Sequence, residues 1–222
     1  RSIYEFRDQW KFGIDYSKEF FGNNKTRFGL FGEYRSGRPY SLTMLENVGG
    51  RGAVFGTVGN LGKQLLYIPT LNDTRVSFDS AASQTAFDTL ITNLGLDKYR
   101  GRIVPKNSQT SSDFFKVDLH MSQEIPVTGT AKVELFADIE NVLNMIDSDW
   151  GALRQVPFDY TSTVVRVQCL TAAQPTGTAG TAATSSTQNC AQYRYSNVVA
   201  PAEVLQTRQS LYGIRVGAKI KF

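Results

Sequence analysis

Residues 212–222 alternate between two kinds of side chain, and this alternation constrains the fold more than any other feature of the sequence. Successive side chains of a β-strand point to opposite faces, so the run forms one apolar face and one face of cationic residues and glycine. The first face comprises Tyr212, Ile214, Val216, Ala218, Ile220 and Phe222, and the second comprises Gly213, Arg215, Gly217, Lys219 and Lys221. The segment is therefore predicted to be an amphipathic strand.

Four other segments alternate in the same way. Residues 10–17 and 27–35 flank the turn-prone Gly22-Asn23-Asn24, and residues 115–122 and 132–140 flank Pro126-Val127-Thr128-Gly129. Each pair is expected to form a hairpin with a short connection. With the closing run, five strands are predicted near residues 6–20, 25–41, 113–125, 130–144 and 208–222. Alternation over about ten residues suits a strand that crosses a bilayer at a tilt.

Composition excludes two classes of protein. No uninterrupted apolar stretch approaches the roughly 18 residues that a membrane-spanning helix needs. The 24 basic and 20 acidic residues give a net charge of +4. The basic residues are scattered and form no stripe, so no nucleic-acid partner is expected.

The connections between the strands separate a soluble β-sandwich from a membrane barrel. Short turns near Asn23 and Thr128 alternate with long connections at about residues 42–112 and 145–207. Unstructured loops of that length are uncommon in compact domains, whereas outer-membrane barrels combine short periplasmic turns with long extracellular loops. We therefore expect an all-β fold. It is an antiparallel transmembrane β-barrel segment in outer-membrane lipid, with residues 1–222 as one partial domain, extracellular long loops and Phe222 in the periplasm.

Four segments resemble a known family when they are taken in order. They are Tyr34-Arg35-Ser36-Gly37-Arg38-Pro39-Tyr40-Ser41, Lys116-Val117-Asp118-Leu119, Phe136-Ala137-Asp138-Ile139-Glu140-Asn141-Val142-Leu143-Asn144 and the closing strand. Together they resemble the C-terminal strands of TonB-dependent outer-membrane receptors, in particular the Oar-like branch. The resemblance covers all five predicted strands and neither long loop.

The resemblance implies that these strands belong to a larger barrel. Five antiparallel strands cannot close, because single-chain barrels begin at about eight strands. Receptors of this family have roughly 22 strands around an N-terminal plug. The expected partners are therefore the remaining strands, the plug, and the TonB complex acting through an N-terminal part outside this sequence. Phe222 is expected to be the natural C-terminus, and Arg1 is not expected to be the natural start.

The last eight residues also resemble the signal by which barrel-assembly machinery recognises its clients. Its polar, glycine and two apolar positions fall on Arg215, Gly217, Ile220 and Phe222. An edge strand presents unpaired backbone groups that an insertase can capture by strand addition. The assembly machinery is thus an expected partner during biogenesis, although any final barrel strand has a similar pattern.

The long connections contain local signals of their own. Asp79 is predicted to cap a short helix in which Phe87, Leu90, Ile91 and Leu94 form one stripe, with Gly95 at its end. The glycine-rich residues 49–62 lack a Walker lysine and are expected to form a flexible loop. Residues 163–168 and 191–197 are expected to pair as a hairpin.

Cys169 and Cys190 are the two cysteines of the chain. Because the expected compartment is oxidising, a disulfide is predicted between them. Closure of a loop of about twenty residues contributes roughly 3 kcal/mol in the chain-entropy model.

Catalytic, cofactor and metal sites find little support, and no enzyme activity is expected. The one histidine, His120, lies two residues from Asp118 on a predicted strand, and no serine has the Gly-x-Ser-x-Gly context of a hydrolase nucleophile. A wall contact inside the lumen is the expected role of His120. Asn144, Asp147 and Asp149 are candidate calcium ligands, but such closely spaced acids are more often solvated loop residues.

Charges of both signs are expected to line the barrel lumen. They are Lys11, Asp15, Arg27, Glu33, Arg35, Lys116, Asp118, Lys132, Glu134, Asp138, Glu140, Arg215, Lys219 and Lys221. They solvate the wall and pair across strands, and by resemblance they contact a plug. The predicted function is uptake of a scarce solute of unknown class. The alternatives are an outer-membrane structural or adhesive protein and a soluble β-sandwich binding module.

Overall fold

A computed structural model describes residues 2–46, 51–52, 54–57, 63–185 and 188–222. Strands account for 49% and helices for 12%, which confirms the all-β fold class. The chain divides into two compact units, whereas a single domain was expected. Unit 1 comprises residues 1–3, 39–109 and 156–202, and unit 2 comprises residues 4–38, 110–155 and 203–222.

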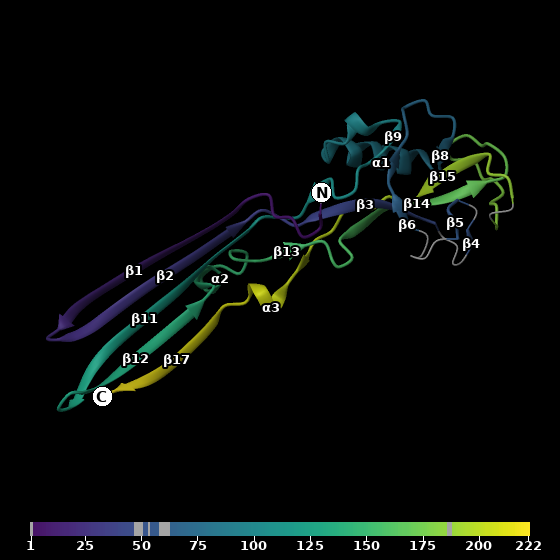
Figure 1. The fold of residues 1–222 in the computed structure, drawn as a ribbon. Coiled ribbons are helices and arrows are strands. Elements are labelled where there is room, and N and C mark those ends of the chain that lie inside the picture. Colours follow the sequence, from purple (N-terminus) through teal and green to yellow (C-terminus); the bar gives the residue numbers. More distant parts are fainter. Residues whose placement is uncertain (1, 47–50, 53, 58–62, 186–187) are drawn as a thin grey trace. The chain divides into compact units, whose positions relative to one another are not determined.

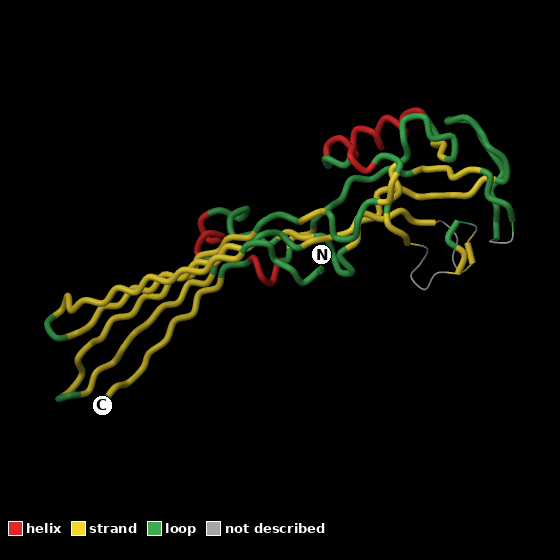
Figure 2. Tube along the Cα trace, turned by 45° about the horizontal axis from the view of Figure 1, so that its top comes forward, coloured by secondary structure: helices red, strands yellow, loops and turns green. Residues whose placement is uncertain are grey.

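Unit 2 is built on one antiparallel sheet of five long strands in the order β1-β2-β11-β12-β17 (Figures 1 and 2). The strands are β1 (Gln9–Phe21), β2 (Asn24–Arg35), β11 (Phe114–Thr128), β12 (Ala131–Glu140) and β17 (Gly213–Lys221). The two predicted hairpins are confirmed, since β1 pairs with β2 and β11 with β12. Among the described strands β1 and β17 each pair on one side only, so the sheet is open.

The second strand ends earlier than predicted. The expected range was 25–41, but β2 stops at Arg35, and residues 39–46 belong to a different sheet. Pro39 supplies no N–H to a ladder. Gly37 passes so close to the backbone of Ser111 that an added Cβ would overlap the Ser111 carbonyl. The chain therefore leaves the ladder at these residues.

The fourth and fifth strands are also shorter than expected. The predicted range 130–144 is interrupted at Asn141, which has the left-handed conformation (φ 51°) that asparagine tolerates. Its amide donates to the carbonyl oxygens of Gly151 at 2.9 Å and Ser210 at 2.6 Å. Short elements complete this region: α2 (Val142–Ile146), β13 (Arg154–Gln155), β16 (Val204–Leu205) and α3 (Thr207–Ser210).

Unit 1 contains most of the two segments that were expected to be long loops. Its main sheet runs in the order β10-β3-β14-β15-β8, with β6 paired to β3, and the β3–β14 and β15–β8 pairs are parallel. The strands are β3 (Pro39–Glu46), β6 (Lys63–Leu65), β8 (Val76–Phe78), β10 (Gln109–Thr110), β14 (Thr161–Leu170) and β15 (Gln192–Ser196). The antiparallel β14–β15 pair confirms the predicted hairpin.

Smaller elements flank this sheet. β7 (Tyr67–Ile68) pairs with β9 (Arg102–Ile103), and a 3₁₀ turn, η1, spans Asp97–Tyr99. Most of the glycine-rich residues 49–62 lie outside the described residues, so the predicted flexible loop is not described as a whole. Within it, β4 (Arg51–Gly52) pairs with β5 (Gly56–Thr57).

The predicted helix is present as α1 (Ala81–Asn93), and its apolar stripe contributes Phe87 and Ile91 to the core of unit 1. The cap differs from the prediction. Ser80, not Asp79, accepts a hydrogen bond from the backbone N–H of Ser83, because the Ser80 hydroxyl lies immediately before the first turn. Gly95 follows with φ +65°, a conformation that glycine adopts without steric cost.

Candidate functional site

One face of the five-stranded sheet is apolar and exposed. Trp10 is 69% exposed and Val216 is 74% exposed, values that belong to side chains with almost no protein neighbour on their outer side. The ladder register places the following exposed residues on this face: Trp10, Phe12, Ile14, Tyr16, Phe28, Phe115, Ile125, Leu135, Ile214, Val216 and Ile220. The face is therefore suited to an apolar environment.

Aromatic side chains border this face at both ends. Trp10, Tyr34 and Phe115 lie opposite one another across three strands, and Tyr212 and Phe222 bracket the apolar face of β17. Ten residues separate Tyr212 from Phe222, which at about 3.3 Å per residue is about 33 Å along the strand. At a strand tilt of roughly 40° this corresponds to about 25 Å, the height of the apolar band of outer-membrane barrels.

The polar edge of the apolar face differs between strands. Lys18, Thr26 and Gln123 lie in one row of β1, β2 and β11, whereas β12 and β17 carry Leu135 and Ala218 in the same row. The polar border of the apolar face is therefore slanted across the sheet.

The opposite face carries a polar row that crosses all five strands. Its members, in the order of the strands, are Asp15, Gly29, His120, Asp138 and Arg215. Asp138 is bonded on both sides: the Nδ1 atom of His120 contacts Oδ1, and Arg215 donates to Oδ2 at 2.8 and 3.0 Å. His120 thus contacts Asp138 of the neighbouring strand.

The charges predicted to face the lumen share this polar face by register. Several of them pair with one another, for example Lys116 with Asp118 at 3.0 Å. Arg35 instead lies against aromatic rings, with its guanidinium carbon 5.1 Å from the ring centre of Phe6 and 5.0 Å from that of Phe114. These residues give the face its charged character.

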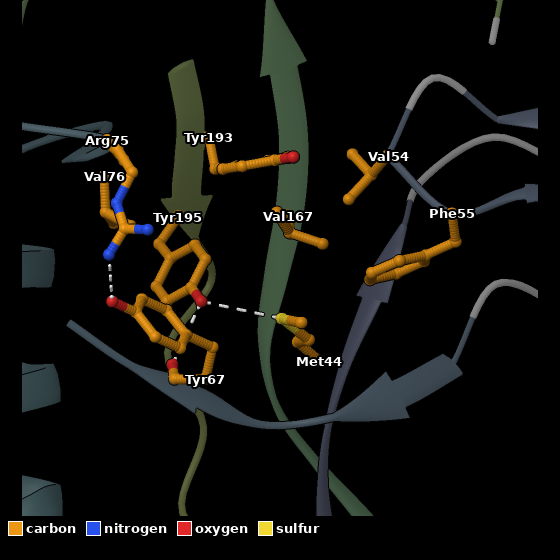
Figure 3. A pocket seen from close by; sticks show the side chains of 9 residues that line it. All are labelled: Met44, Val54, Phe55, Tyr67, Arg75, Val76, Val167, Tyr193 and Tyr195. Carbon is orange, nitrogen blue, oxygen red and sulfur yellow. Dashed lines mark hydrogen bonds between the residues drawn. The ribbon is translucent and has the colours of Figure 1, made fainter. Parts of the chain in front are cut away.

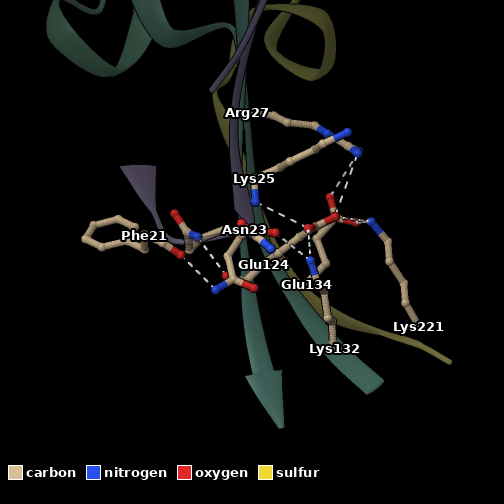
Figure 4. A network of polar contacts seen from close by, with 10 residues as sticks. Phe21, Asn23, Lys25, Arg27, Glu124, Lys132, Glu134 and Lys221 are labelled. Carbon is tan, nitrogen blue, oxygen red and sulfur yellow. Dashed lines mark hydrogen bonds and ion pairs between the residues drawn. The ribbon is translucent and has the colours of Figure 1, made fainter. Parts of the chain in front are cut away.

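Glu124 and Glu134 form a like-charged pair directly across the β11–β12 ladder (Figure 4). Their side chains are only 8% and 5% exposed. Lys221 Nζ bridges them at 2.9 and 2.7 Å, and Lys132 Nζ lies 3.3 Å from Glu124. Arg27 approaches Glu134 at 3.6 Å. The cations compensate a pair that would otherwise repel, so this cluster joins the end of β17 to β11 and β12.

The four residues of the predicted assembly signal all lie on β17 or directly after it. Arg215 bonds Asp138, and Gly217 lies opposite Phe136. Ile220 is 65% exposed and Phe222 is 97% exposed. The outer edge of β17 has no paired strand among those described.

Two of the candidate calcium ligands make contacts of their own. Asn144 donates to the carbonyl oxygens of Ser148 and Trp150, and Asp149 forms an ion pair with Arg154 at 3.0 Å. Across the described ranges, no group of three His, Cys, Asp or Glu side chains lies close enough to hold a metal ion.

Unit 1 contains a cavity of about 310 Å³ that sequence reasoning missed (Figure 3). It is lined by Met44, Val54, Phe55, Tyr67, Arg75, Val76, Val167, Tyr193 and Tyr195. These residues come from segments as far apart in sequence as β3 and β15. The only advance signal was the alternation of Tyr193 and Tyr195 in the predicted hairpin.

Several groups at or beside the cavity have perturbed pKa values, among them Asp73 and Tyr195. Hydrogen bonds from Arg75, opposed by partial burial, lower the pKa of Asp73, and the Tyr67 hydroxyl adds to this effect. Burial raises the pKa of Tyr195, whose hydroxyl donates to the Tyr67 carbonyl at 3.0 Å. At neutral pH the shifts therefore favour an ionised Asp73, which accepts these hydrogen bonds, and a neutral Tyr195, whose hydroxyl can donate.

Cys169 and Cys190 form the predicted disulfide within unit 1, with Cα atoms 5.4 Å apart. The bridge ties the end of β14 to the residues before β15. The disulfide therefore lies where the Thr-, Ala-, Ser- and Gly-rich connection between β14 and β15 meets the two strands.

Comparison with protein families, with characterised proteins and with solved structures finds no significant match to this chain. In the part of the chain that the structure describes, no helix combines the length and the apolar composition that crossing a membrane requires.

Proposed function

We propose that the chain is the C-terminal barrel portion of a TonB-dependent outer-membrane receptor that imports a scarce solute into a Gram-negative bacterium. The observation that carries this proposal is the five-stranded sheet with one exposed apolar face and one charged face. Its apolar face has aromatic borders at a spacing that fits a bilayer. Outer-membrane strands have this arrangement, because lipid contacts one face and water the other.

Exposure of the apolar face argues against the soluble β-sandwich. Trp10, Ile14, Val216 and Ile220 are each more than 60% exposed, at 69%, 62%, 74% and 65%. A soluble monomer rarely leaves a contiguous apolar patch of more than a few hundred Å² in water. Contact with lipid removes the unfavourable exposure of this apolar face to water.

The open edges of β1 and β17 support a larger barrel. In lipid every backbone N–H and C=O needs a partner, so neither edge can remain unpaired. Further strands of the parent polypeptide provide those partners in this proposal. In this proposal the two long connections are extracellular, and the short turns at Gly22-Asn23 and Gly129-Thr130 face the periplasm.

Transport coupled to TonB rests on the resemblance of the four segments named above. The competing role is structural or adhesive, with unit 1 binding a surface partner and no solute crossing. A TonB-contacting segment upstream in the parent polypeptide, together with uptake that stops when the inner-membrane proton gradient is collapsed, supports transport. Binding without energy-dependent uptake supports the adhesive role.

Cysteine labelling in intact cells tests the membrane arrangement. Asn72 and Thr130 are both exposed, one in unit 1 and one in a short turn. In the parent protein, a membrane-impermeant maleimide should label the Asn72→Cys variant in intact cells. It should label the Thr130→Cys variant only after the outer membrane is permeabilised. Equal labelling of both positions in intact cells would contradict the proposal.

A further inference from the structure

The cavity of unit 1 combines an apolar body with one cationic end. Met44, Val54, Val76 and Val167 contribute aliphatic or thioether surface, and Phe55, Tyr67, Tyr193 and Tyr195 contribute rings. Arg75 is the one charged residue of the lining. A volume of about 310 Å³ is at the lower end of the range of small-molecule sites.

The floor of this cavity is rigid. Tyr195 is 2% exposed, and its ring lies 5.8 Å from that of Phe78 and 5.7 Å from that of Phe87, which α1 supplies. Its hydroxyl donates to the Tyr67 carbonyl at 3.0 Å, with Met44 Sδ at 3.5 Å. A floor fixed in this way keeps the cavity preformed, so that binding costs little conformational entropy.

The side of the cavity formed by Val54 and Phe55 is also anchored. The buried carboxylate of Glu46 accepts the backbone N–H groups of Val54 at 2.8 Å and Phe55 at 3.1 Å. Each oxygen of the carboxylate thus accepts one of these two N–H groups. Val54 and Phe55 are therefore held in place as a wall of the site.

Arg75 is oriented by Asp73 and Tyr67. Arg75 Nε and Nη2 donate to Asp73 at 3.1 and 3.2 Å, and Nη2 donates to the Tyr67 hydroxyl at 2.8 Å. Tyr67 in turn donates to Asp73 at 2.6 Å. A guanidinium has five N–H donors, and within the described part of the chain the two on Nη1 have no partner.

A ligand in the cavity meets the charge of Arg75 and not that of Asp73. The Asp73 side chain is 6% exposed and both of its oxygens accept hydrogen bonds, whereas the Arg75 side chain is 71% exposed. The Tyr193 hydroxyl offers a second polar contact, and among the described residues nothing bonds it; Figure 3 shows this ring beside Tyr195 at the cavity. The lining thus combines apolar and aromatic side chains with the Arg75 guanidinium and the Tyr193 hydroxyl.

We propose that this cavity binds a small aromatic carboxylate. The ring of the ligand packs among the aromatic and aliphatic side chains of the lining, and its carboxylate accepts the Nη1 donors of Arg75. A sugar would leave its hydroxyl groups against apolar walls, which is costly, and a cationic ligand would be repelled by Arg75. The inference rests on unit 1 alone and holds independently of the membrane location of unit 2.

Isothermal titration calorimetry on the full chain in detergent micelles tests this site with three probes of matched shape. They are 2-naphthoate, its neutral amide 2-naphthamide, and the saturated decahydronaphthalene-2-carboxylate, each corrected for titration into empty micelles. We expect 2-naphthoate to bind and the amide to bind about tenfold more weakly, because a neutral carbonyl replaces the charged carboxylate as acceptor and the ion pair with Arg75 is lost. The saturated acid should also bind more weakly, because it loses ring stacking.

Variants then locate the site. Arg75→Gln should weaken binding of 2-naphthoate about tenfold, and Tyr193→Ala should weaken it as well. Arg100→Gln is the matched control, since Arg100 belongs to the same unit and pairs with Asp88 and Asp97 away from the lining. It should bind as the unmodified chain does. The comparison of acid and amide on the unmodified chain requires no variant to fold.

Three results would overturn the proposal. They are no binding of 2-naphthoate, equal binding of the acid and the amide, and binding that neither Arg75→Gln nor Tyr193→Ala weakens in folded protein. The last would place the ligand outside this cavity.

Discussion

Gly217 of β17 lies directly opposite Phe136 of β12, and the aromatic ring occupies the space in which a side chain at position 217 would stand. A Cβ built on Gly217 would lie 2.5 Å from Cζ of Phe136. The ring is flanked by His120, with ring centres 6.5 Å apart, and by Lys219 Nζ at 5.0 Å. The glycine of the predicted assembly signal therefore has a packing role of its own.

Gly217→Ala is expected to destabilise the sheet, because the Phe136 ring must move from its position between His120 and Lys219. The expected cost is about 1–2 kcal/mol, as for other overpacked sites. Gly213→Ala on the same strand is the control, since nothing lies within 4 Å of its added Cβ. Urea unfolding in micelles measures both. Equal midpoints for the two variants would show that Phe136 does not constrain position 217.

Lys221→Gln should weaken the junction of β11, β12 and β17, since it leaves the opposed carboxylates of Glu124 and Glu134 with less compensation. We expect a loss of about 1–2 kcal/mol, because Lys221 is partly exposed and solvent screens the pair. Lys219→Gln is the control, because Lys219 lies on the same face and contacts the Phe136 ring. Protease resistance of the C-terminal strand should fall in Lys221→Gln alone. Similar protease resistance in both variants would contradict the stabilising role of Lys221 between Glu124 and Glu134.

The stability of unit 1 should fall in acid through Asp73. Its pKa in the folded state is lower than its ordinary value of 3.8 because Arg75 and Tyr67 bond the charged form. A depressed pKa contributes stability above the unfolded pKa, and this contribution is lost as the pH falls through the folded value. The stability of Asp73→Asn should therefore change less below about pH 4 than that of the unmodified chain. Asp79→Asn, an exposed neighbour, should retain the full acid dependence in thermal unfolding.

Removing the disulfide should lower the stability of unit 1. Cys169 and Cys190 are 21 residues apart in sequence, and a loop of this size corresponds to about 3 kcal/mol in the chain-entropy model. Cys169→Ser with Cys190→Ser should lower the unfolding midpoint of unit 1 by the corresponding amount. Before any substitution, alkylation without reductant should add no mass. A mass increase at that stage would contradict the bridge.

The sequence predicted those parts of the fold in which residues that are close in sequence also contact one another. The alternation around Gly22-Asn23 and Gly129 predicted both hairpins, because strands joined by short turns pair with each other. The stripe of Phe87 and Ile91 predicted α1, because apolar residues four positions apart lie on one face of a helix. The cap was misplaced by one residue because Asp79 and Ser80 have similar capping preferences.

The rest depended on contacts between distant segments. Thr43 and Thr163 are opposite each other in the parallel β3–β14 pair although 120 residues separate them, and no local pattern indicates such a pairing. The cavity has the same origin, because it joins Met44, Arg75 and Tyr195 from separate parts of unit 1. Two long connections were therefore expected as loops where a compact unit forms.

Contact of Trp10 with lipid tests the central proposal, a membrane-spanning sheet, most directly. Trp10 and Trp150 are the two tryptophans of the chain, so Trp150→Phe leaves Trp10 as the reporter and Trp10→Phe leaves Trp150. The measurement uses the parent protein reconstituted in bilayers, with its other tryptophans replaced in both variants.

With lipids brominated near the head-group end of their acyl chains, we predict strong quenching of Trp10 fluorescence, because this residue borders the apolar band. Trp150, which follows α2 outside the strands, should be quenched by aqueous iodide and little affected by bromine. Equal accessibility of Trp10 and Trp150 to iodide, with no bromine quenching of Trp10, would contradict the assignment of the apolar face to lipid.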